Sequence, residues 1–525
     1  METQKKDQRL TIRRALLSVS DKSGIIDLGK ALIEHGAEIL ASGGTAQVLR
    51  HAGLAVTDVE SVTGNPEAFG GRMKTLSFKM SSGILYRRGN EQDEEDRKNL
   101  GILPIDAVVV NFYPFEDAKQ KYENGQISVE ELIEQIDIGG PTLVRAAAKN
   151  APDVLTLMDP HDYRVIIEEL LIQKGIQQET IVRCTQKAWS EVSHYDRVIG
   201  EVFGSHIPLK YGENPHQSAF FEIEKNSPIA WNAPLTDSAL SYNNMLDISA
   251  GYELLNELQQ WRPDDSSVVI VKHNQPCGVA LFEGVSSEKQ KEAFLRAWEG
   301  DPISAFGGVV LFSHPLGEET ALLLRDQFIE CVVAPGMDSE TSSLKLLCEK
   351  RKNLKAVRIN YFGSLEFAHQ IRVVGGTLTQ GRDQGMNESF VSQTQNSWNS
   401  KDDALGAFGV FVTRALKSNA IALVRSLEGG FQCVGAGQGQ PNRVEALQKL
   451  AIPRAQAVLK KQTLEECILV SDAFFPFRDS IDFSASFGIK KIIQPGGSRK
   501  DQEVITACNE QGVAMAFSGV RHFRH

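Results

Sequence analysis

The sequence predicts an α/β protein with more than one domain. At 525 residues the chain is too long for one ordinary core, and roughly two to four domains are expected. Hydrophobic residues make up 42%, aromatic residues 7% and charged residues 23%, as in an ordinary globular protein. From residue 14 onward, short apolar runs alternate with amphipathic segments, a pattern typical of parallel strands joined by helices.

The first elements predict a βαβαβ unit. The run "ALLSV" predicts a buried strand, "GIIDLGKALIEHG" a helix, "AEILAS" a strand, "TAQVLRHAG" a helix and "LAVTDVE" a third strand. The segments "IDAVVVNFYPF" (105–115) and "DVLTLMDP" (153–160) predict further strands of the same sheet. Connections of this kind give a parallel sheet with helices on its faces.

A domain boundary is predicted between residues 203 and 204. The polar, helix-rich segment 161–203 ends there, and the loop-like "HIPLKYGENPHQ" follows. We therefore expect a polar tail over 1–13, an N-terminal domain over 14–203 and a larger region over 204–525. In that region, strands predicted at 268–271, 308–312, 421–424 and 467–470 alternate with helices. The polar, aperiodic residues 375–405 predict a surface excursion between its two halves.

Composition also restricts location and partners. A formal net charge of −11 argues against a surface for nucleic acid, which requires basic stripes. No window reaches the roughly 18 apolar residues of a membrane span, and the N-terminus lacks an apolar signal core. The seven cysteines are scattered and form no C-x-x-C pair, which favours reduced thiols over zinc or disulfides. We expect a cytoplasmic protein that binds no metal, membrane or nucleic acid.

Two turns of the N-terminal region suit a phosphate. "SVSDKSG" (18–24) and "ASGGTA" (41–46) each follow a strand and open a helix, so hydroxyl groups and glycine amides meet at the carboxyl edge of the sheet. Ordinary helix caps at Ser20, Ser42 or Thr45 would produce the same pattern. Downstream, "GGRMKTL" and the small-residue segment "RAAAKN" carry cations that are either solvated or directed into a pocket.

The stretch "VKHNQPCG" (271–278) ends a buried strand with Lys272 and His273 side by side. One interpretation is acid–base chemistry, with the imidazole kept neutral by the neighbouring ammonium group. The other is a strand end with a snorkelling lysine. Neighbouring strand residues point to opposite faces, so a shared site requires the strand to end at about Val271, before Pro276. Zinc deaminases need P-C-x-x-C and H-x-E, and "PCGVA" lacks the second cysteine.

Many blocks together resemble one enzyme family over almost the whole chain. In order they are "SVSDKSG", "ASGGTA", "GGRMKTL", "NFYPF", "QIDIGGPTLVRAAAKN", "YGENPHQ", "YNNMLD", "VKHNQPCG", "SAFGG", "KSNAI", "GAGQ", "SDAFFPFRDSID" and "RHF". This series resembles the bifunctional AICAR transformylase/IMP cyclohydrolase family of purine biosynthesis. The resemblance implies a methylglyoxal-synthase-like N-terminal domain and a transformylase region of two cytidine-deaminase-like subdomains without zinc. It also implies a homodimer with transformylase sites between subunits.

The resemblance implies two activities. The transformylase moves a formyl group from 10-formyltetrahydrofolate, a folate cosubstrate, to AICAR, and the cyclohydrolase closes the product FAICAR to IMP with loss of water. For the cyclohydrolase it implies catalytic roles for Lys74, Tyr113, Asp137 and Lys149, the last as proton donor and acceptor. The implied substrate contacts of that site are Ser20, Asp21, Lys22, Ser42, Gly43, Gly44, Thr45, Arg72, Met73, Lys74, Thr75, Val110, Asn111, Asp137 and Ile138.

For the transformylase, His273 is implied as the general base, with Lys272 as electrostatic stabiliser and Asn419 as an orienting group. The implied nucleotide contacts are Lys210, Tyr211, Asn244, His273, Gly307, Glu330, Asn419 and Arg443. The implied folate contacts are Val444, Phe474, Asp479, Ser498, Arg499 and Arg521.

Three segments depart from the family pattern. "KTLSFKMSSG" lacks the usual histidine and proline after the cyclohydrolase lysine, Lys210 replaces an arginine, and "GAGQGQPNRV" is longer than usual. The first departure leaves a transformylase-only enzyme as a rival interpretation. A regulatory nucleotide-binding protein on the same scaffold is a rival from another class.

Overall fold

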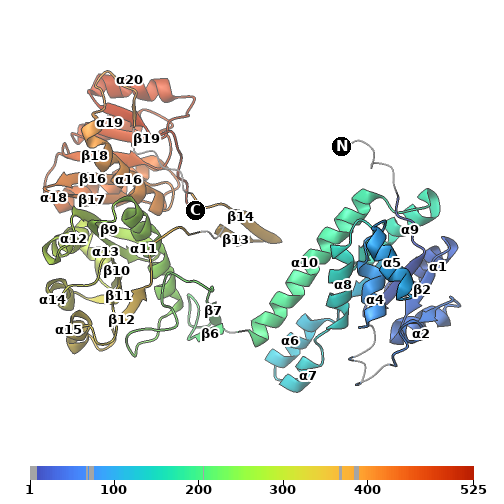
Figure 1. Cartoon of the computed structure of the whole chain (residues 1–525). Helices are drawn as coiled ribbons and strands as arrows, with labels where there is room; N and C mark the ends of the chain where they lie inside the picture. The colour runs from blue at the N-terminus through green and yellow to red at the C-terminus, as the bar shows by residue number, and fades with distance from the viewer. Residues whose placement is uncertain are drawn as a thin grey trace. The chain divides into compact units, whose positions relative to one another are not determined.

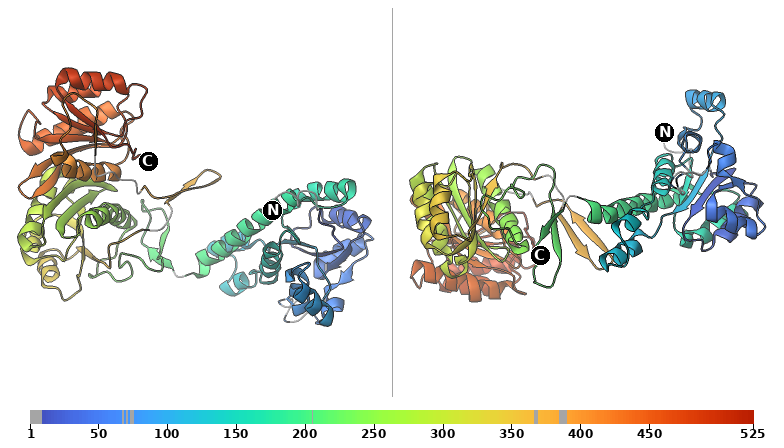
Figure 2. Two further views of the ribbon diagram at one scale, coloured as in Figure 1. Left: turned by 45° about the horizontal axis from the view of Figure 1, so that its top comes forward. Right: turned by 90° about the horizontal axis from the view of Figure 1, so that it is seen from below.

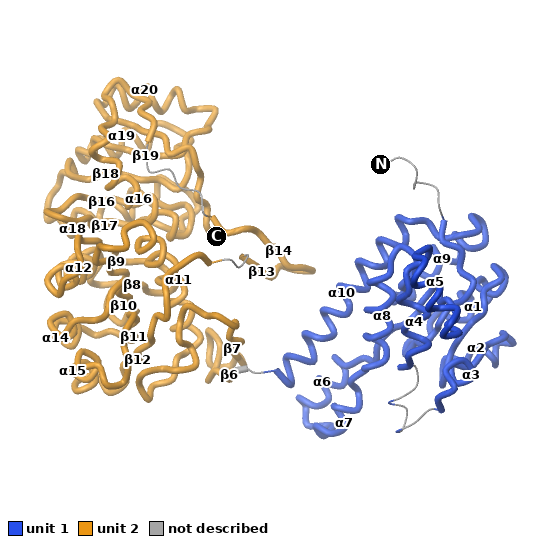
Figure 3. Tube along the Cα trace, in the orientation of Figure 1, with its two compact units in different colours: residues 1–205 blue, residues 206–525 orange. Residues whose placement is uncertain are grey.

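The computed structural model describes residues 9–66, 69, 72, 76–204, 206–365, 369–383 and 390–525. The predicted site residues Met73, Lys74 and Thr75 lie outside these described residues. The chain divides into two compact units, residues 1–205 and 206–525 (Figure 3). No helix in the described part of the chain is long and apolar enough to cross a membrane.

The first unit contains a parallel sheet. Its described strands follow the order β3-β2-β1-β4-β5. Their bounds are β1 (Arg14–Val19), β2 (Glu38–Ala41), β3 (Thr57–Asp58), β4 (Ala107–Asn111) and β5 (Leu155–Leu157). In the register, Leu16 lies opposite Leu40 on one side and Val108 on the other. The strand order reverses beside β1, and the carboxyl ends at such a point form the usual ligand crevice of open α/β sheets.

Helices cover both faces of this sheet (Figure 1). Their bounds are α1 (Ile25–Glu34), α2 (Gly43–His51), α3 (Val59–Thr63), α4 (Phe78–Leu85), α5 (Glu91–Asn99), α6 (Phe115–Glu123), α7 (Val129–Ile133), α8 (Gly139–Lys149), α9 (Tyr163–Gln173) and α10 (Gln178–Phe203), with a 3₁₀ turn over Pro160–Asp162. Alternate residues of β1 enter different cores: Leu17 packs with α1 and α9, and Leu16 packs with α4 and α8. The predicted alternation of strand and helix is therefore the layered α/β arrangement observed here.

The second unit contains a mixed sheet. Its described strands follow the order β12-β11-β10-β8-β9-β17-β16-β18-β19-β20-β15. Their bounds are β8 (Asp265–Lys272), β9 (Gln275–Glu283), β10 (Gly308–Phe312), β11 (Ile329–Pro335), β12 (Lys355–Ile359), β15 (Val391–Ser392), β16 (Ile421–Leu427), β17 (Gly430–Gly437), β18 (Cys467–Ser471), β19 (Lys491–Gln494) and β20 (Ala514–Phe517). Two short hairpins stand apart from this sheet, β6 (His206–Leu209) with β7 (Ala219–Glu222) and β13 (His369–Val373) with β14 (Gly376–Gln380).

The helices of the second unit lie on both faces of its sheet (Figure 2). Their bounds are α11 (Tyr242–Trp261), α12 (Ser287–Gly300), α13 (Pro302–Ala305), α14 (Glu318–Asp326), α15 (Ser342–Lys350), α16 (Asp403–Ala415), α17 (Arg443–Glu445), α18 (Ile452–Leu459), α19 (Asp479–Ser486) and α20 (Asp501–Gln511). A 3₁₀ turn spans Ser400–Asp402 and a π-helical turn spans Ala446–Ala451.

The second unit is built from two halves of equal topology. From the outside inward, β12-β11-β10-β8-β9 in one half corresponds to β20-β19-β18-β16-β17 in the other. The halves meet where β9 pairs with β17, at Phe282 opposite Gly430. One core beneath α11 and α16 runs through both halves, whereas the opposite face has a separate core in each half. The connection between the halves carries the exposed hairpin β13–β14, whose second strand lies within the polar segment 375–405.

Candidate functional site

The first candidate site lies at the carboxyl edge of the sheet in the first unit, where Asn111 closes the loop after β1. Asn111 ends β4 beside Val19, the last residue of β1. Its side-chain oxygen accepts hydrogen bonds from the N–H groups of Ser20 (2.6 Å) and Asp21 (2.9 Å), and its amide donates to the Asp21 carbonyl (2.9 Å). These hydrogen bonds fix the backbone of the loop "SDKSG" at the point where the strand order reverses.

The start of α2 faces the same edge. Ser42 precedes the helix, but its side chain makes no capping bond, so the helix-cap interpretation does not account for this serine. Gly43, Gly44 and Thr45 supply the first N–H groups of α2, which have no partner within the helix. Lys22 lies over this turn, because a Cβ on Gly44 would meet its Cε at 3.5 Å. These groups form a cationic, N–H-rich corner suited to a phosphate.

The resemblance implies a substrate contact for Thr45, but the Thr45 side chain binds the backbone of β1. It is buried, and its hydroxyl accepts from the Val19 N–H (3.1 Å) and donates to the Val19 carbonyl (3.2 Å). Val110 is likewise buried in the core. The side chains of both residues are buried, and the substrate contacts implied for them stay predictions.

The start of α8 adds a carboxylate to this edge. Asp137 accepts the Gly140 N–H at 2.8 Å, and its own N–H donates to the Tyr195 hydroxyl at 2.8 Å. Burial raises the pKa of Asp137, although the N–H groups of Gly140 and Gly139 oppose this shift. Ile138 is exposed beside it. Asp137 is thus a held, partly buried carboxyl group within the candidate site.

Two other predicted residues flank the start of α8. Tyr113 is 43% exposed directly after β4, so its ring is accessible to a ligand. Arg72 forms an exposed ion pair with Glu134, just beyond the end of α7. Glu134 lies three residues before Asp137 in sequence, so this ion pair brings the Arg72 guanidinium to the segment that leads into α8.

Lys149 lies at the opposite edge of the sheet. It is the last residue of α8, which has 11 residues, so it stands roughly 16 Å along the helix axis from the Asp137 end. The next residue, Asn150, donates to the carbonyls of Ile84 (2.6 Å) and Tyr86 (3.0 Å), beside the start of β4. Lys149 therefore does not meet Asp137 and Asn111 within one chain, and the role implied for it stays a prediction.

The second candidate site is built on the turn between β8 and β9. β8 ends at Lys272, and β9 begins at Gln275, its partner across the turn. The two turn residues, His273 (φ 52) and Asn274 (φ 62), both adopt left-handed backbone conformations, as in a tight hairpin. The strand therefore ends one residue later than predicted. Pro276 is not the cause, since it lies inside β9 opposite Val271.

The Lys272 side chain is held by backbone and carboxylate groups. Its ammonium donates to the Gly307 carbonyl at 2.5 Å and lies 3.8 Å from a Glu330 oxygen. The second Glu330 oxygen accepts from the Asn244 amide at 3.1 Å. Gly307 has φ +70, and a Cβ there would meet the Lys272 ammonium at 3.0 Å. Four residues predicted from the sequence are thus brought together, with the exposed His273 next to them.

A neighbouring group of residues surrounds Asn419. The Asn419 amide donates to the carbonyls of Gln440 (3.0 Å) and Pro441 (3.1 Å). The Lys417 N–H donates to the Gln275 side chain at 3.1 Å, which joins this group to the β8–β9 turn. Asn419 and His273 therefore belong to one edge of the sheet.

Arg443 is an interior residue and not an open ligand contact. Its guanidinium donates to Asp472 (2.6 Å) and to the Phe474 carbonyl (3.1 Å), and the two charged side chains are 7% and 0% exposed. The second Asp472 oxygen accepts from the Ser418 hydroxyl at 2.6 Å. The nucleotide contact implied for Arg443 stays a prediction. Asp472 lies within "SDAFFPFRDSID". The sequence does not indicate its role as the counter-ion of Arg443, because the two residues are 29 positions apart.

The implied folate residues follow the strands of the second half. Phe474 and Asp479 come after β18, Ser498 and Arg499 after β19, and Arg521 after β20. These parallel strands end at one edge, so the residues share it. Asp479 and Arg499 are exposed, Phe474, Ser498 and Val444 are half-buried, and Arg521 lies over the Phe523 ring at 4.6 Å.

Lys210 and Tyr211 follow β6. The Lys210 ammonium lies 5.8 Å from the Tyr211 ring centre. Their loop reaches the start of α11, where the Asn243 amide donates to the Glu213 carbonyl at 3.5 Å. The loop therefore lies close to Asn244.

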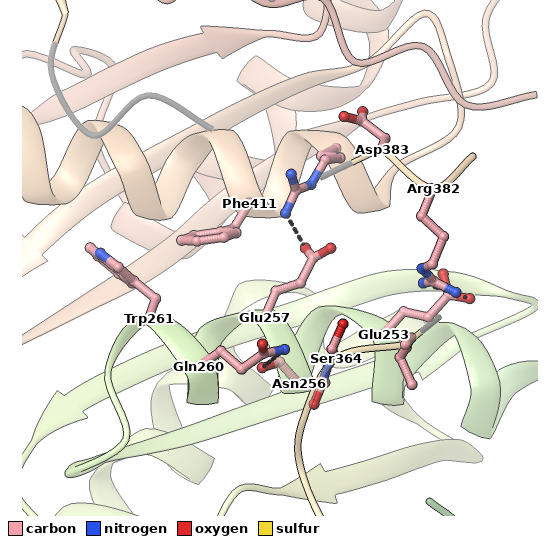
Figure 4. A pocket seen from close by; sticks show the side chains of 11 residues that line it. Glu253, Asn256, Glu257, Gln260, Trp261, Ser364, Arg382, Asp383 and Phe411 are labelled. Carbon is pink, nitrogen blue, oxygen red and sulfur yellow. Dashed lines mark hydrogen bonds and ion pairs between the residues drawn. The ribbon is translucent and has the colours of Figure 1, made fainter. Parts of the chain in front are cut away.

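A cavity of about 380 Å³ lies elsewhere, between α11 and α16 (Figure 4). Glu257 and Arg414 form an ion pair of 2.7 Å within it, and none of the predicted site residues lines it. Burial raises the pKa of Glu257, which the Arg414 charge opposes. Among the described residues, no group of three or more His, Cys, Asp or Glu side chains is arranged to hold a metal ion.

Comparisons with known proteins match the chain to a family. The model described as AICARFT/IMPCHase bienzyme matches residues 147–454, and the MGS-like domain matches residues 24–142. The chain belongs to the AICARFT/IMPCHase bienzyme family. The predicted family, its MGS-like α/β fold and its two activities as an enzyme of purine biosynthesis are confirmed.

Curated relatives match over almost their whole length. A "Bifunctional purine biosynthesis protein PurH" from Persephonella marina is 39% identical, and one of the same name from Aquifex aeolicus is 42% identical. In both cases the match covers 98% of this chain and 100% of the relative. A solved structure described as "Crystal structure of ForH" is 34% identical, covers 37% of this chain and 99% of its own, and has a TM-score of 0.31.

Proposed function

We propose that the second unit transfers the formyl group of 10-formyltetrahydrofolate to AICAR, and that the first unit closes the product, FAICAR, to IMP. The observation that carries this proposal is the β8–β9 turn, which presents an exposed His273 next to a Lys272 ammonium held by Gly307 and Glu330. A base beside a fixed cation suits transfer to a poor amine nucleophile.

In formyl transfer, His273 takes the proton that the AICAR amine loses as its nitrogen attacks the formyl carbon. Negative charge develops on the formyl oxygen, and the Lys272 ammonium lies where it can stabilise that charge. The bond between the formyl carbon and the folate nitrogen then breaks, that nitrogen takes up a proton, and tetrahydrofolate leaves. An ammonium group has three N–H donors, and the Gly307 carbonyl accepts one of them. Asn419 orients the intermediate from the adjoining group of residues.

In cyclisation, the carboxamide nitrogen of FAICAR attacks its own formyl carbon, and water leaves. Because the reaction is intramolecular, the protein mainly has to hold the substrate in the reactive conformation. The α2 N–H groups and Lys22 would hold the phosphate, while Asn111 and Asp137 would contact the reacting end. The raised pKa of Asp137 supports a role in proton transfer at this end.

We further propose a cytoplasmic homodimer that uses folate and needs no metal. The residues implied for one transformylase site form two groups within the chain, one around Lys272 and one around Asn419. A partner subunit that completes each group would fit this division. All seven cysteines are unpaired, which supports a reducing compartment.

Replacing the proposed base tests the transformylase. His273→Ala should lower formyl transfer at least about 100-fold, while IMP formation from purified FAICAR stays unchanged. Unaltered formyl transfer would refute the role of His273 as the base, whereas a loss of transfer would exclude a nucleotide-binding regulatory protein.

A separate comparison tests the cyclohydrolase. Asn111→Ala should lower IMP formation from FAICAR about tenfold or more, because it frees the loop after β1. Lys149→Ala should change this rate less, since Lys149 lies at the other edge. A wild-type rate no higher than spontaneous closure would support the transformylase-only enzyme.

A further inference from the structure

We infer that Asp247 is a positioning residue for formyl transfer, because its carboxylate holds the two-residue turn that carries His273. This inference rests on the proposed function of His273 as the base. Asp247 forms part of α11, which also carries Asn244 three residues earlier. Residues at this spacing share one helix face. One face of α11 therefore contacts Glu330, which lies beside the Lys272 ammonium, and Asn274, which follows His273.

The contact between Asp247 and the turn is direct. One Asp247 oxygen accepts the Asn274 N–H at 2.5 Å, and the residue is 9% exposed. α11 is fixed beneath the sheet by Ile248 and Leu255, both fully buried, so the carboxylate cannot follow a moving turn. The β8–β9 hairpin is thus tied to a rigid element at the residue after His273.

The turn needs such a tie. His273 and Asn274 both have positive φ, a region that residues other than glycine occupy only when their surroundings hold them there. Without the carboxylate, the Asn274 N–H would lose its acceptor, and either water or a different turn would satisfy it. The His273 imidazole, on the preceding residue, would then change its position. Asn244 performs the parallel task for Lys272 through Glu330.

The charge of Asp247 acts on the same group. The charged groups that face it are His273 and Lys272 on the hairpin and Glu330 on β11. An ionised Asp247 favours the imidazolium that forms when His273 accepts the substrate proton. Burial raises the pKa of Asp247, whereas the Asn274 N–H and the two cations lower it. Asp247 thus contributes a hydrogen bond and a charge, which two substitutions separate.

The test compares Asp247→Ala with Asp247→Asn in the full-length enzyme. Asp247→Ala should lower kcat for formyl transfer about tenfold or more, with KM for AICAR within about twofold. Asp247→Asn retains an acceptor oxygen, so it should keep more of the kcat. Removing the negative charge should move the acidic limb of its pH–rate profile to lower pH, because the imidazolium loses a stabilising neighbour.

Asp265→Ala is a matched control. Asp265 begins β8, the strand whose other end leads into the His273 turn. Asp265 is also buried, and its carboxylate also accepts a backbone N–H, that of Gly284 at 3.0 Å. The control should lower thermal stability without changing the pH profile. IMP formation from FAICAR by each variant reports an intact first unit.

Three results would overturn the inference. They are an unchanged kcat in Asp247→Ala, an unchanged pH profile in Asp247→Asn, and a loss in Asp247→Ala that Asp265→Ala reproduces. If Asp247→Ala does not fold, the pH profile of Asp247→Asn decides alone. The variant His273→Ala distinguishes failure of the proposed function. If it transferred the formyl group at the full rate, His273 would not be the base, whatever the result for Asp247.

Discussion

Gly307→Ala should impair formyl transfer more than it impairs folding. Gly307 has φ +70, and an alanine in the left-handed region costs roughly 1–2 kcal/mol. The new Cβ would also stand 3.0 Å from the Lys272 ammonium and 3.1 Å from the Phe328 ring. The ring contacts Phe306, with 4.9 Å between ring centres, and the lysine is the group that moves because its ammonium ends a flexible side chain.

The size of the effect follows from what the ammonium loses. Its hydrogen bond to the Gly307 carbonyl involves a charged donor, a class that contributes about 1.5–3 kcal/mol. If the displaced ammonium loses that amount in the transition state, formyl transfer falls roughly 10- to 100-fold. IMP formation from FAICAR, carried out by the first unit, should not change.

Two assays on one preparation measure this: formyl transfer from 10-formyltetrahydrofolate, and IMP formation from FAICAR. Gly512→Ala is the matched control, since Gly512 has a similar φ of +65 and its Cβ would find its nearest neighbour at 3.6 Å. It introduces the same backbone strain without crowding Lys272. Equal formyl-transfer rates in the two variants would refute the argument.

Three further predictions concern stability. Asp472→Asn leaves the buried Arg443 guanidinium without its counter-ion and should destabilise the second unit by about 3–5 kcal/mol in urea unfolding. Thr45→Val removes both hydrogen bonds to the β1 backbone and should lower the stability of the first unit by about 1–3 kcal/mol. Hydrogen bonds from Arg87 lower the pKa of Asp93 from 3.8 to about 2, so its stabilisation is present above pH 3.8 and is lost as pH falls toward 2. The stability difference between wild type and Asp93→Asn should narrow over that range.

Each of these has a contradicting result. A loss below about 1 kcal/mol in Asp472→Asn would mean that the ion pair is not desolvated, as for the exposed pair Asp326–Lys350. An unchanged unfolding midpoint in Thr45→Val would show that the two hydrogen bonds of the Thr45 hydroxyl to Val19 do not stabilise the first unit. A stability difference independent of pH would show that Asp93 titrates normally in the folded protein.

The sequence predicted strands and the position of the β8–β9 turn where a local pattern or the order of residues was sufficient. Period-two and unbroken apolar runs predicted β1, β4, β8, β10, β16 and β18, because burial on a sheet face imposes its pattern on each strand separately. It also predicted that Lys272 and His273 meet at a strand end. The cause was wrong: two left-handed residues make the turn, and Pro276 lies within β9.

Long-range placement could not be predicted in the same way. Lys149 and Asp137 belong to one quoted block, yet a helix of 11 residues carries them to opposite edges of the sheet. The resemblance implied a ligand contact for Arg443. Nothing nearby in the chain indicates that Asp472 neutralises this arginine. The tie from Asp247 to the His273 turn likewise joins residues 27 positions apart.

By itself, the sequence determined the family, the α/β alternation and the residue types at both candidate sites, since these depend on short segments and their order. The tertiary structure alone decided which charged groups are free to act and which neutralise one another inside the protein. It also decided that His273 occupies an exposed turn held by α11. These outcomes depend on distances between residues far apart in the chain, which are set only when the sheets and helices pack.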